Sequence, residues 1–204
     1  MGNRGPNKVG RETRERLLAA GMSQFHSGGF NGTGVDQIVK EAEVPKGSFY
    51  NFFDSKSAFA AEVIDLYFQR HKLKLEQFLG DPDLSPLARF RAYFEERIQF
   101  FTGLEFQRGC MMGNLSVETS DQNEEIRSRL EANFHAWTAI FADTVREGQE
   151  RGEIHKLYSA EEMGQFVLNS WEGAILRMKA EKSVRPLRNA ATMLLDLLSV
   201  GGAR

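Results

Sequence analysis

The sequence has few of the features that stabilise secreted proteins or anchor proteins in membranes. One cysteine in 204 residues excludes an internal disulfide and fits a reducing cytoplasm. No run of eighteen apolar residues occurs, so we expect no membrane span. The first ten residues, MGNRGPNKVG, lack the apolar stretch of a secretory signal. We therefore expect a cytoplasmic protein without a membrane partner.

The patterns that usually carry catalysis are missing as well. The four histidines form no HxxxH pair, the single cysteine cannot form a zinc cluster, and no glycine-rich phosphate loop is present. The residues that flank the cysteine match no thiol-hydrolase pattern. We therefore expect no enzymatic activity, no catalytic residue, no metal site and no cofactor.

Helical periodicity is present in every long segment outside the turns, and no segment shows convincing strand alternation. The helices are expected at about residues 11–27, 35–41, 46–52, 56–79, 86–104, 114–119, 122–152, 160–182 and 186–200. This pattern predicts an all-α fold. An N-terminal three-helix domain (residues 1–53) with a helix-turn-helix precedes a larger C-terminal helical domain (residues 54–204).

Charge is unevenly distributed along the chain. The net charge is -2, but residues 1–56 carry eight Lys/Arg against six Asp/Glu, which leaves a net charge of -4 for the rest. Five of those cations lie at or before Arg16. A basic, glycine-containing N-terminal arm suits a flexible segment that follows a DNA backbone or minor groove. A solvated disordered tail is the alternative interpretation.

Residues 32–56, GTGVDQIVKEAEVPKGSFYNFFDSK, read as two short helices joined by a tight turn. Thr33 is expected to cap the first helix with its hydroxyl. Pro45 separates the two helices, because the residue before a proline is disfavoured in a helix. Three phenylalanines can anchor the second helix from behind, which leaves its polar residues facing outward. A purely structural corner is the alternative interpretation.

The outward-facing residues of the second helix suit DNA. Lysine, glycine and serine at a helix start offer a cation, a close backbone approach and a hydroxyl, which are what phosphates and base edges require. Lys56 follows just before the next helix, where it can add a phosphate contact. The expected DNA-binding residues are Thr33, Lys46, Gly47, Ser48, Tyr50, Asn51 and Lys56.

Residues 14–59 resemble the DNA-binding domain of the TetR family of bacterial transcriptional regulators. The match rests on Gly29-Phe30, Gly32-Thr33, Ala42-Glu43-Val44 and the specific order VPKGSFYxxFxSK. The resemblance implies a homodimer. Its N-terminal domain would bind double-stranded operator DNA, and its C-terminal helices would bind a small-molecule effector.

The last two expected helices are candidates for the dimer surface. Each of these helices has more apolar residues than one narrow stripe along its surface can hold, so one side can pack on the rest of the chain and another on a partner. The small residues Ser170, Gly173 and Ala174 let a partner helix approach. A single helix-turn-helix reads too few bases for a specific site, so recognition usually needs two modules related by a two-fold axis. We therefore expect a homodimer through these helices. Two core helices of a monomer are the alternative.

Aromatic and sulfur side chains of the larger helical domain predict a mostly apolar effector pocket. Each of these residues taken alone also fits an ordinary core position. Asn114, Glu118 and Asn169 are possible polar groups within this pocket. The expected effector-binding or sensing residues are Cys110, Phe101, Met111, Asn114, Trp137, Phe141 and Trp171.

Cys110 lies between Gly109 and an expected helix, beside Arg108. A cysteine near a helix N-terminus and a cation can have a depressed pKa and form a reactive thiolate. The stretch GCMMGNLSVE also resembles a branch of the TetR family that includes regulators of electrophile-reducing enzymes and of acrylate metabolism. In the electrophile-responsive members of that branch, the cysteine is the sensor. A buried, inert thiol is the alternative.

The sequence therefore predicts a TetR-type DNA-binding transcriptional regulator. We expect a repressor that a small-molecule or electrophilic effector releases from its operator, and activation in place of repression stays open. A protein of another class is the alternative: a helical small-molecule-binding or thiol-based redox protein that does not bind an operator. Salt-dependent binding of promoter DNA separates the two.

Overall fold

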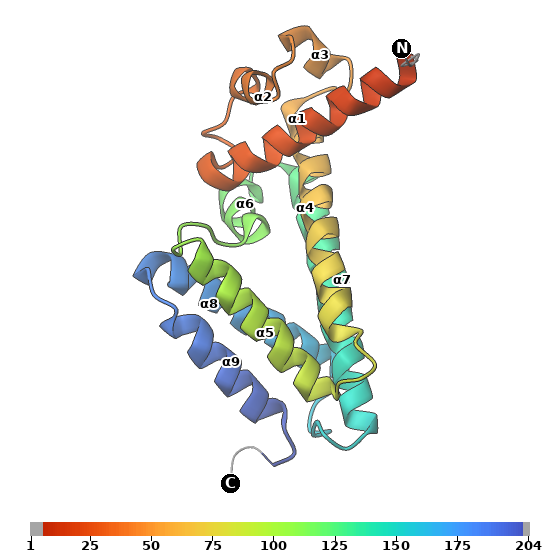
Figure 1. Cartoon of the computed structure of the whole chain (residues 1–204), viewed down its shortest axis with the longest axis vertical. Coiled ribbons are helices and arrows are strands. Elements are labelled where there is room, and N and C mark those ends of the chain that lie inside the picture. Colours follow the sequence, from red (N-terminus) through yellow and green to blue (C-terminus); the bar gives the residue numbers. More distant parts are fainter. Residues whose placement is uncertain (1–5, 202–204) are drawn as a thin grey trace. The chain divides into compact units, whose positions relative to one another are not determined.

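The computed structural model describes residues 6–201, and this part of the chain is helical almost throughout (Figure 1). One isolated antiparallel bridge, between Ile154 and Ser199, is its only strand-like pairing. The helices are α1 (Pro6–Gly28), α2 (Val35–Glu41), α3 (Lys46–Tyr50), α4 (Lys56–Leu79), α5 (Pro86–Gly103), α6 (Met111–Thr119), α7 (Glu124–Glu150), α8 (Ala160–Glu181) and α9 (Arg185–Leu198). The all-α fold expected from the sequence is confirmed.

Most helix boundaries agree with the sequence pattern, and two differences matter for function. Helix α1 begins at Pro6 and not near Arg11, so Lys8 and Arg11 lie in a helix and not in a flexible arm. Arg4 lies outside the described residues. Helix α6 begins at Met111 and not at Asn114, directly after the cysteine. None of the helices in residues 6–201 is long and apolar enough to cross a membrane.

The chain forms two compact units. The head unit contains the chain up to Gln69 together with Met111–Glu131, and the body unit contains Arg70–Cys110 together with the chain from Ala132. The divisions therefore fall inside α4, inside α7 and just before α6. The head unit holds α6 in addition to the helix-turn-helix, and the boundary expected at residue 53 stays a prediction.

Aromatic side chains form the core of the head unit. The Phe59 ring of α4 lies 4.7 Å from the ring of Phe53, 5.0 Å from that of Phe49 and 5.8 Å from that of Phe25. A Cβ atom at Gly21 of α1 would overlap the Phe59 ring. The missing side chain therefore lets α1 approach α4 closely, and the packed rings hold α3 from behind as the sequence predicted.

The helix-turn-helix differs from the sequence prediction at its first cap. Gly34, and not Thr33, is the N-cap of α2, and its amide donates to Gln37 Oε1 at 2.6 Å. Thr33 is buried, and its hydroxyl donates to the Gly29 carbonyl at 2.7 Å instead of capping α2. At the other end of α2, the Arg16 guanidinium donates to the Glu43 carbonyl at 2.9 Å. This arginine of α1 therefore caps α2.

The body unit is built on packed helices. Helix α9 packs against α8 and α5, as Figure 1 shows. Helix α8 begins with a capping box, in which the Ser159 side chain accepts from the Glu162 amide. A Cβ atom at Gly164 would lie 2.7 Å from the Ala142 backbone, so α7 and α8 approach closely there.

Candidate DNA-binding surface and effector site

Helix α3 presents the residues that the sequence assigned to DNA. Phe49 is buried and Ser48 is half-buried. The exposed residues of this helix and its C-cap are Lys46, Gly47, Tyr50 and Asn51. A Cβ atom at Gly47 would meet nothing within 4 Å, so the backbone there is open to approach. We call this the α3 surface; it comprises Lys46, Gly47, Ser48, Tyr50 and Asn51.

The cation of the α3 surface has an intramolecular partner. Lys46 Nζ lies 2.7 Å from Asp36 Oδ1 of α2, and this hydrogen bond raises the pKa of Lys46. Both side chains are more than half exposed, so the pair contributes little stability. A DNA phosphate can therefore replace Asp36 at small cost.

Two other residues assigned to DNA have different positions. Thr33 is only 1% exposed, so we leave it out of the DNA-binding surface. Lys56 donates from Nζ to the Phe30 carbonyl at 2.5 Å and lies 4.1 Å above the centre of the Phe30 ring. Burial lowers the pKa of Lys56, and the nearby Glu118 carboxylate opposes this shift. The ammonium group of Lys56 is thus engaged inside the head unit.

Glu118, near the end of α6, bonds to the turn that follows α1. The Phe30 amide donates to its Oε2 at 2.8 Å, and the Asn31 amide donates to its Oε1 at 2.6 Å. Each carboxylate oxygen therefore accepts one backbone hydrogen bond. These bonds lie within the head unit.

The residues assigned to the effector are buried, except Asn114, which is half-buried. They are divided between the two units. Met111 and Asn114 belong to the head unit, whereas the body unit holds Phe101, Cys110, Trp137, Phe141 and Trp171.

Three of the body-unit residues belong to one continuous cluster of rings. Trp171 lies 4.7 Å from Phe94, and Phe94 lies 5.6 Å from Tyr93. Phe141 lies 5.7 Å from Tyr93 and 6.2 Å from Trp137. Phe94 and Tyr93 of α5, which the sequence did not single out, are thus the link between α7 and α8.

Buried polar groups accompany this aromatic cluster. His71 Nε2 lies 3.1 Å from the Tyr93 hydroxyl, and the His71 ring lies 4.2 Å from the Trp137 ring. Burial and then the positive charge of Arg97 lower the pKa of His71 to about 3, so its imidazole is neutral. Burial also raises the pKa of Tyr93 well above its usual value. The cluster therefore offers neutral hydrogen-bonding groups in an apolar setting.

Cys110 is buried, and its thiol is hydrogen-bonded to the Glu172 carboxyl group. Oε1 of Glu172 has no accessible surface and no hydrogen-bond partner, although the residue as a whole is only partly buried. Burial raises the pKa of Glu172 to about 7, and the bond to Cys110 opposes this shift. Arg108, the expected neighbour, is exposed. The thiol therefore has a titratable carboxyl partner that the sequence analysis missed.

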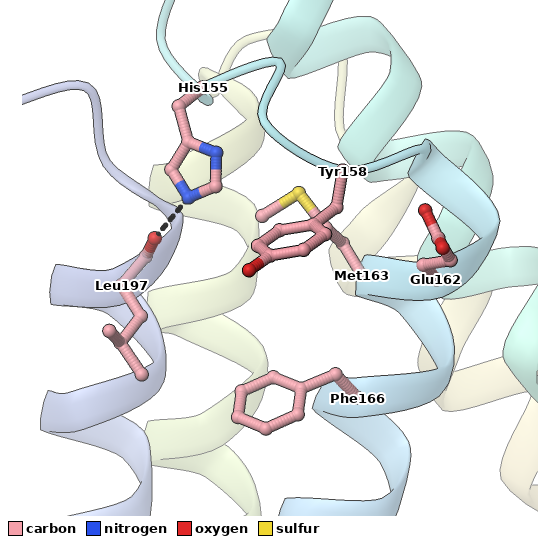
Figure 2. A pocket seen from close by; sticks show the side chains of 6 residues that line it. All are labelled: His155, Tyr158, Glu162, Met163, Phe166 and Leu197. Atoms are coloured by element: carbon pink, nitrogen blue, oxygen red, sulfur yellow. Dashed lines mark hydrogen bonds between the residues drawn. The ribbon is translucent and has the colours of Figure 1, made fainter.

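A separate pocket of about 320 Å³ lies between α8, α9 and the segment that precedes α8. Figure 2 shows the rings of Tyr158 and Phe166 at this pocket and the bond of 2.7 Å between His155 Nε2 and the Leu197 carbonyl. None of the residues assigned to the effector lines it. Its lining residues are His155, Tyr158, Glu162, Met163, Phe166 and Leu197.

Comparison with known families accounts for both parts of the chain. Residues 17–63 match the family model described as bacterial regulatory proteins, tetR family. Residues 86–194, more than half of the chain, match the tetracyclin repressor-like C-terminal domain. The chain belongs to the TetR family. It is a DNA-binding transcriptional regulator, as its sequence predicted.

TetR-family relatives match this chain over most of its length. The transcriptional repressor DhaR of Mycobacterium sp. (strain GP1) is 36% identical over 91% of both chains. The regulator AcuR of Cereibacter sphaeroides is 34% identical, over 86% of this chain and 80% of its own. Among solved structures, the regulatory protein TetR from Rhodobacter sphaeroides superposes with a TM-score of 0.84 at 32% identity, over 90% and 97% of the chains. The reduced form of Escherichia coli NemR superposes with a TM-score of 0.83 at 29% identity, over 94% of this chain and 99% of its own.

The partners of two acidic residues in this TetR-family chain were missed by the sequence analysis, which counted Glu118 only as a possible polar group of the effector pocket and did not single out Glu172. Glu172 is 62 positions from Cys110, and Glu118 is 88 positions from Phe30. Helical periodicity gives no partner for either carboxylate. The glycine pair at 28–29 is a local signal for a tight turn, but it does not indicate which carboxylate binds that turn.

Proposed function

We propose that this TetR-family regulator is a cytoplasmic repressor that binds a pseudo-palindromic operator as a homodimer and releases it when an effector binds the body unit. The observation that carries the proposal is the α3 surface. Lys46, Tyr50 and Asn51 are exposed around an open glycine, while Phe49 anchors the helix in the core of the head unit. Relatives named as repressors, DhaR and NemR, support repression over activation.

The salt dependence of operator binding tests the DNA-binding surface. Lys46→Ala should weaken binding and reduce the slope of log affinity against log salt by about one, because one phosphate contact is lost. Tyr50→Phe should weaken binding if its hydroxyl meets a phosphate. Lys74→Ala, at an exposed position of α4 in the body unit, is the control and should leave the slope unchanged. An unchanged slope in the Lys46 variant would remove α3 from the interface.

The proposed dimer surface lies on α8 and α9. Both helices expose large apolar side chains, whereas Ala174 and Leu194 are buried in their own protomer. The pocket of Figure 2 lies at one end of this surface. A group of large exposed apolar side chains on neighbouring helices is typical of an interaction site. The exposed side chains are Phe166, Leu176, Met193 and Leu197.

We place effector sensing in the body unit, at the aromatic cluster and Cys110. The apolar rings suit a small organic effector, and the thiol suits a soft electrophile. That a solved NemR structure is described as a reduced form supports a redox-dependent state in one relative. The effector shifts the equilibrium only if it prefers the form that does not bind DNA.

Treatment with N-ethylmaleimide tests the thiol. Operator release and labelling of Cys110 in the wild type, with no release in Cys110→Ser, would support sensing at this residue. Equal release in both proteins would show that the reagent acts elsewhere. Labelling without release would leave Cys110 as a core residue and favour a reversible effector.

A further inference from the structure

The turn that follows α1 has the geometry of an anion-binding site. Gly29 has a positive φ of 72°, and the next two backbone amides, those of Phe30 and Asn31, donate to the same acceptor group. Successive amides in such a turn form a concave nest that favours a negative charge. Helix α1 has already ended at Gly28, so these amides need an acceptor outside the helix.

The acceptor is part of the same chain. The two oxygens of Glu118 accept from the two amides at 2.8 and 2.6 Å, and hydrogen bonds to an ionised group are stronger than those between neutral groups. Lys56 completes the arrangement, because its ammonium group donates to the Phe30 carbonyl and lies above the Phe30 ring. One carboxylate therefore holds a turn that joins α1 to the helix-turn-helix.

Gly29 fits this carboxylate for a steric reason as well. A Cβ atom there would lie 2.5 Å from Oε2 of Glu118, nearer than carbon and oxygen atoms approach without a bond. Glycine is therefore required at position 29 for two reasons: the positive φ of the turn and the space that the Glu118 side chain occupies. A fortuitous surface contact would not require both conditions at one residue.

Helix α6 is held at its other end too. The Met111 amide, at the start of α6, lies 3.4 Å from the Tyr67 hydroxyl of α4. Met111 also directly follows Cys110, and the division between the two units falls between these residues. The peptide bond between Cys110 and Met111 therefore joins α6 directly to the segment that ends at Cys110.

We infer that Glu118 is a positioning residue that couples α6 to the helix-turn-helix: its carboxylate fixes the turn after α1 in the arrangement that binds the operator, and displacement of α6 frees the turn. This inference rests on the proposed control of operator binding by an effector, and it names the contact through which a movement of α6 changes the helix-turn-helix. It also changes the role of Lys56, whose ammonium group supports the turn and does not contact a phosphate.

Three variants test this coupling in the full-length protein. Glu118→Ala removes the acceptor, and Glu118→Gln keeps one oxygen but loses the charge. Val117→Ala is the matched control, because Val117 is the preceding residue of α6 and is 88% exposed. Hydrogen exchange of the Phe30 and Asn31 amides is measured first, without DNA. We expect exchange more than about tenfold faster in Glu118→Ala, an intermediate rate in Glu118→Gln and no change in the control.

Operator binding at several salt concentrations is measured second. Glu118→Ala should bind about tenfold more weakly or worse with the wild-type salt slope, because no phosphate contact is lost. Lys56→Ala should also weaken binding at an unchanged slope, whereas Lys46→Ala lowers the slope. This difference in slope separates a residue that positions the head from one that touches DNA.

Amide exchange and operator binding test the inference and the proposed function separately. Unchanged amide exchange in Glu118→Ala would overturn the inference whether or not the protein binds the chosen operator. Faster exchange with unchanged or tighter operator binding would also overturn it, because the turn would then not support the DNA-binding arrangement. A wild-type protein that binds no operator would contradict the proposed function alone, and the exchange rates would still decide whether Glu118 holds the turn.

Discussion

At the residue scale, Glu172 links protonation to the stability of the body unit. Its folded-state pKa of about 7 lies above the ordinary value of 4.5, so the folded protein binds this proton more tightly than the unfolded chain does. The stabilising contribution is complete below pH 4.5 and is lost as the pH rises through 7. Above that range the folded state carries a buried charge whose Oε1 has no partner.

We therefore expect Glu172→Gln to gain stability relative to the wild type as the pH rises. The amide stays neutral, so the variant avoids a cost of at most about 3 kcal/mol, which is the free energy that corresponds to the difference between the two pKa values. Urea unfolding between pH 4.5 and 8.5 measures this gap. Glu150→Gln, at an exposed position, is the control and should follow the wild type. Parallel curves for Glu172→Gln and the wild type would contradict the prediction.

Gly47 allows a residue-scale prediction that separates function from folding. Because a Cβ atom there meets nothing within 4 Å, Gly47→Ala should keep the stability of the protein or raise it by up to about 1 kcal/mol through better helix propensity. The same methyl group should weaken operator binding if the backbone must approach DNA. Thermal unfolding and operator titration check the two effects. Equal operator affinity would show that DNA does not approach this glycine.

At the element scale, the contact between α1 and α4 depends on one missing side chain. Gly21→Ala would place a methyl group on the Phe59 ring, so we expect a loss of about 1–3 kcal/mol and weaker operator binding. Gly10→Ala, in the same helix, meets only the Phe52 ring at 4.0 Å and should be neutral or stabilising. Denaturant unfolding of the two variants makes the comparison. Similar stabilities would mean that α1 can shift without cost.

The elements themselves were largely predictable because their signals are local. Helical periodicity gave α2 and α4 with the boundaries that the structure has, although the cap expected for α2 was wrong. The start of α6 was missed, since Gly109 and Gly113 resemble a loop in sequence. The carboxylate contacts of Glu118 and Glu172 were missed for a different reason. They join segments far apart in the chain, and one sequence carries no local signal for such pairs.

At the scale of the whole molecule, the exposed apolar side chains of α8 and α9 predict a dimer that a charge can dissociate. Phe166→Glu or Leu197→Glu should give a folded monomer that no longer binds a palindromic operator tightly, because each change puts a charge where the partner packs. Sedimentation at micromolar concentration measures the state. Leu73→Glu is the control, since Leu73 is also a large exposed apolar residue but lies on α4. A dimer in both Phe166 and Leu197 variants would place the interface elsewhere.

The composition of the head unit has a consequence for the engineering of chimeric regulators. An exchange of operator specificity that transplants only residues 1–53 would separate the Phe30 and Asn31 amides from their carboxylate, because Glu118 belongs to the recipient. The graft would then work only in recipients that supply an acidic residue at the matching place in α6. A chimera that also takes Met111–Glu131 from the donor should bind the donor's operator and still be released by the recipient's effector.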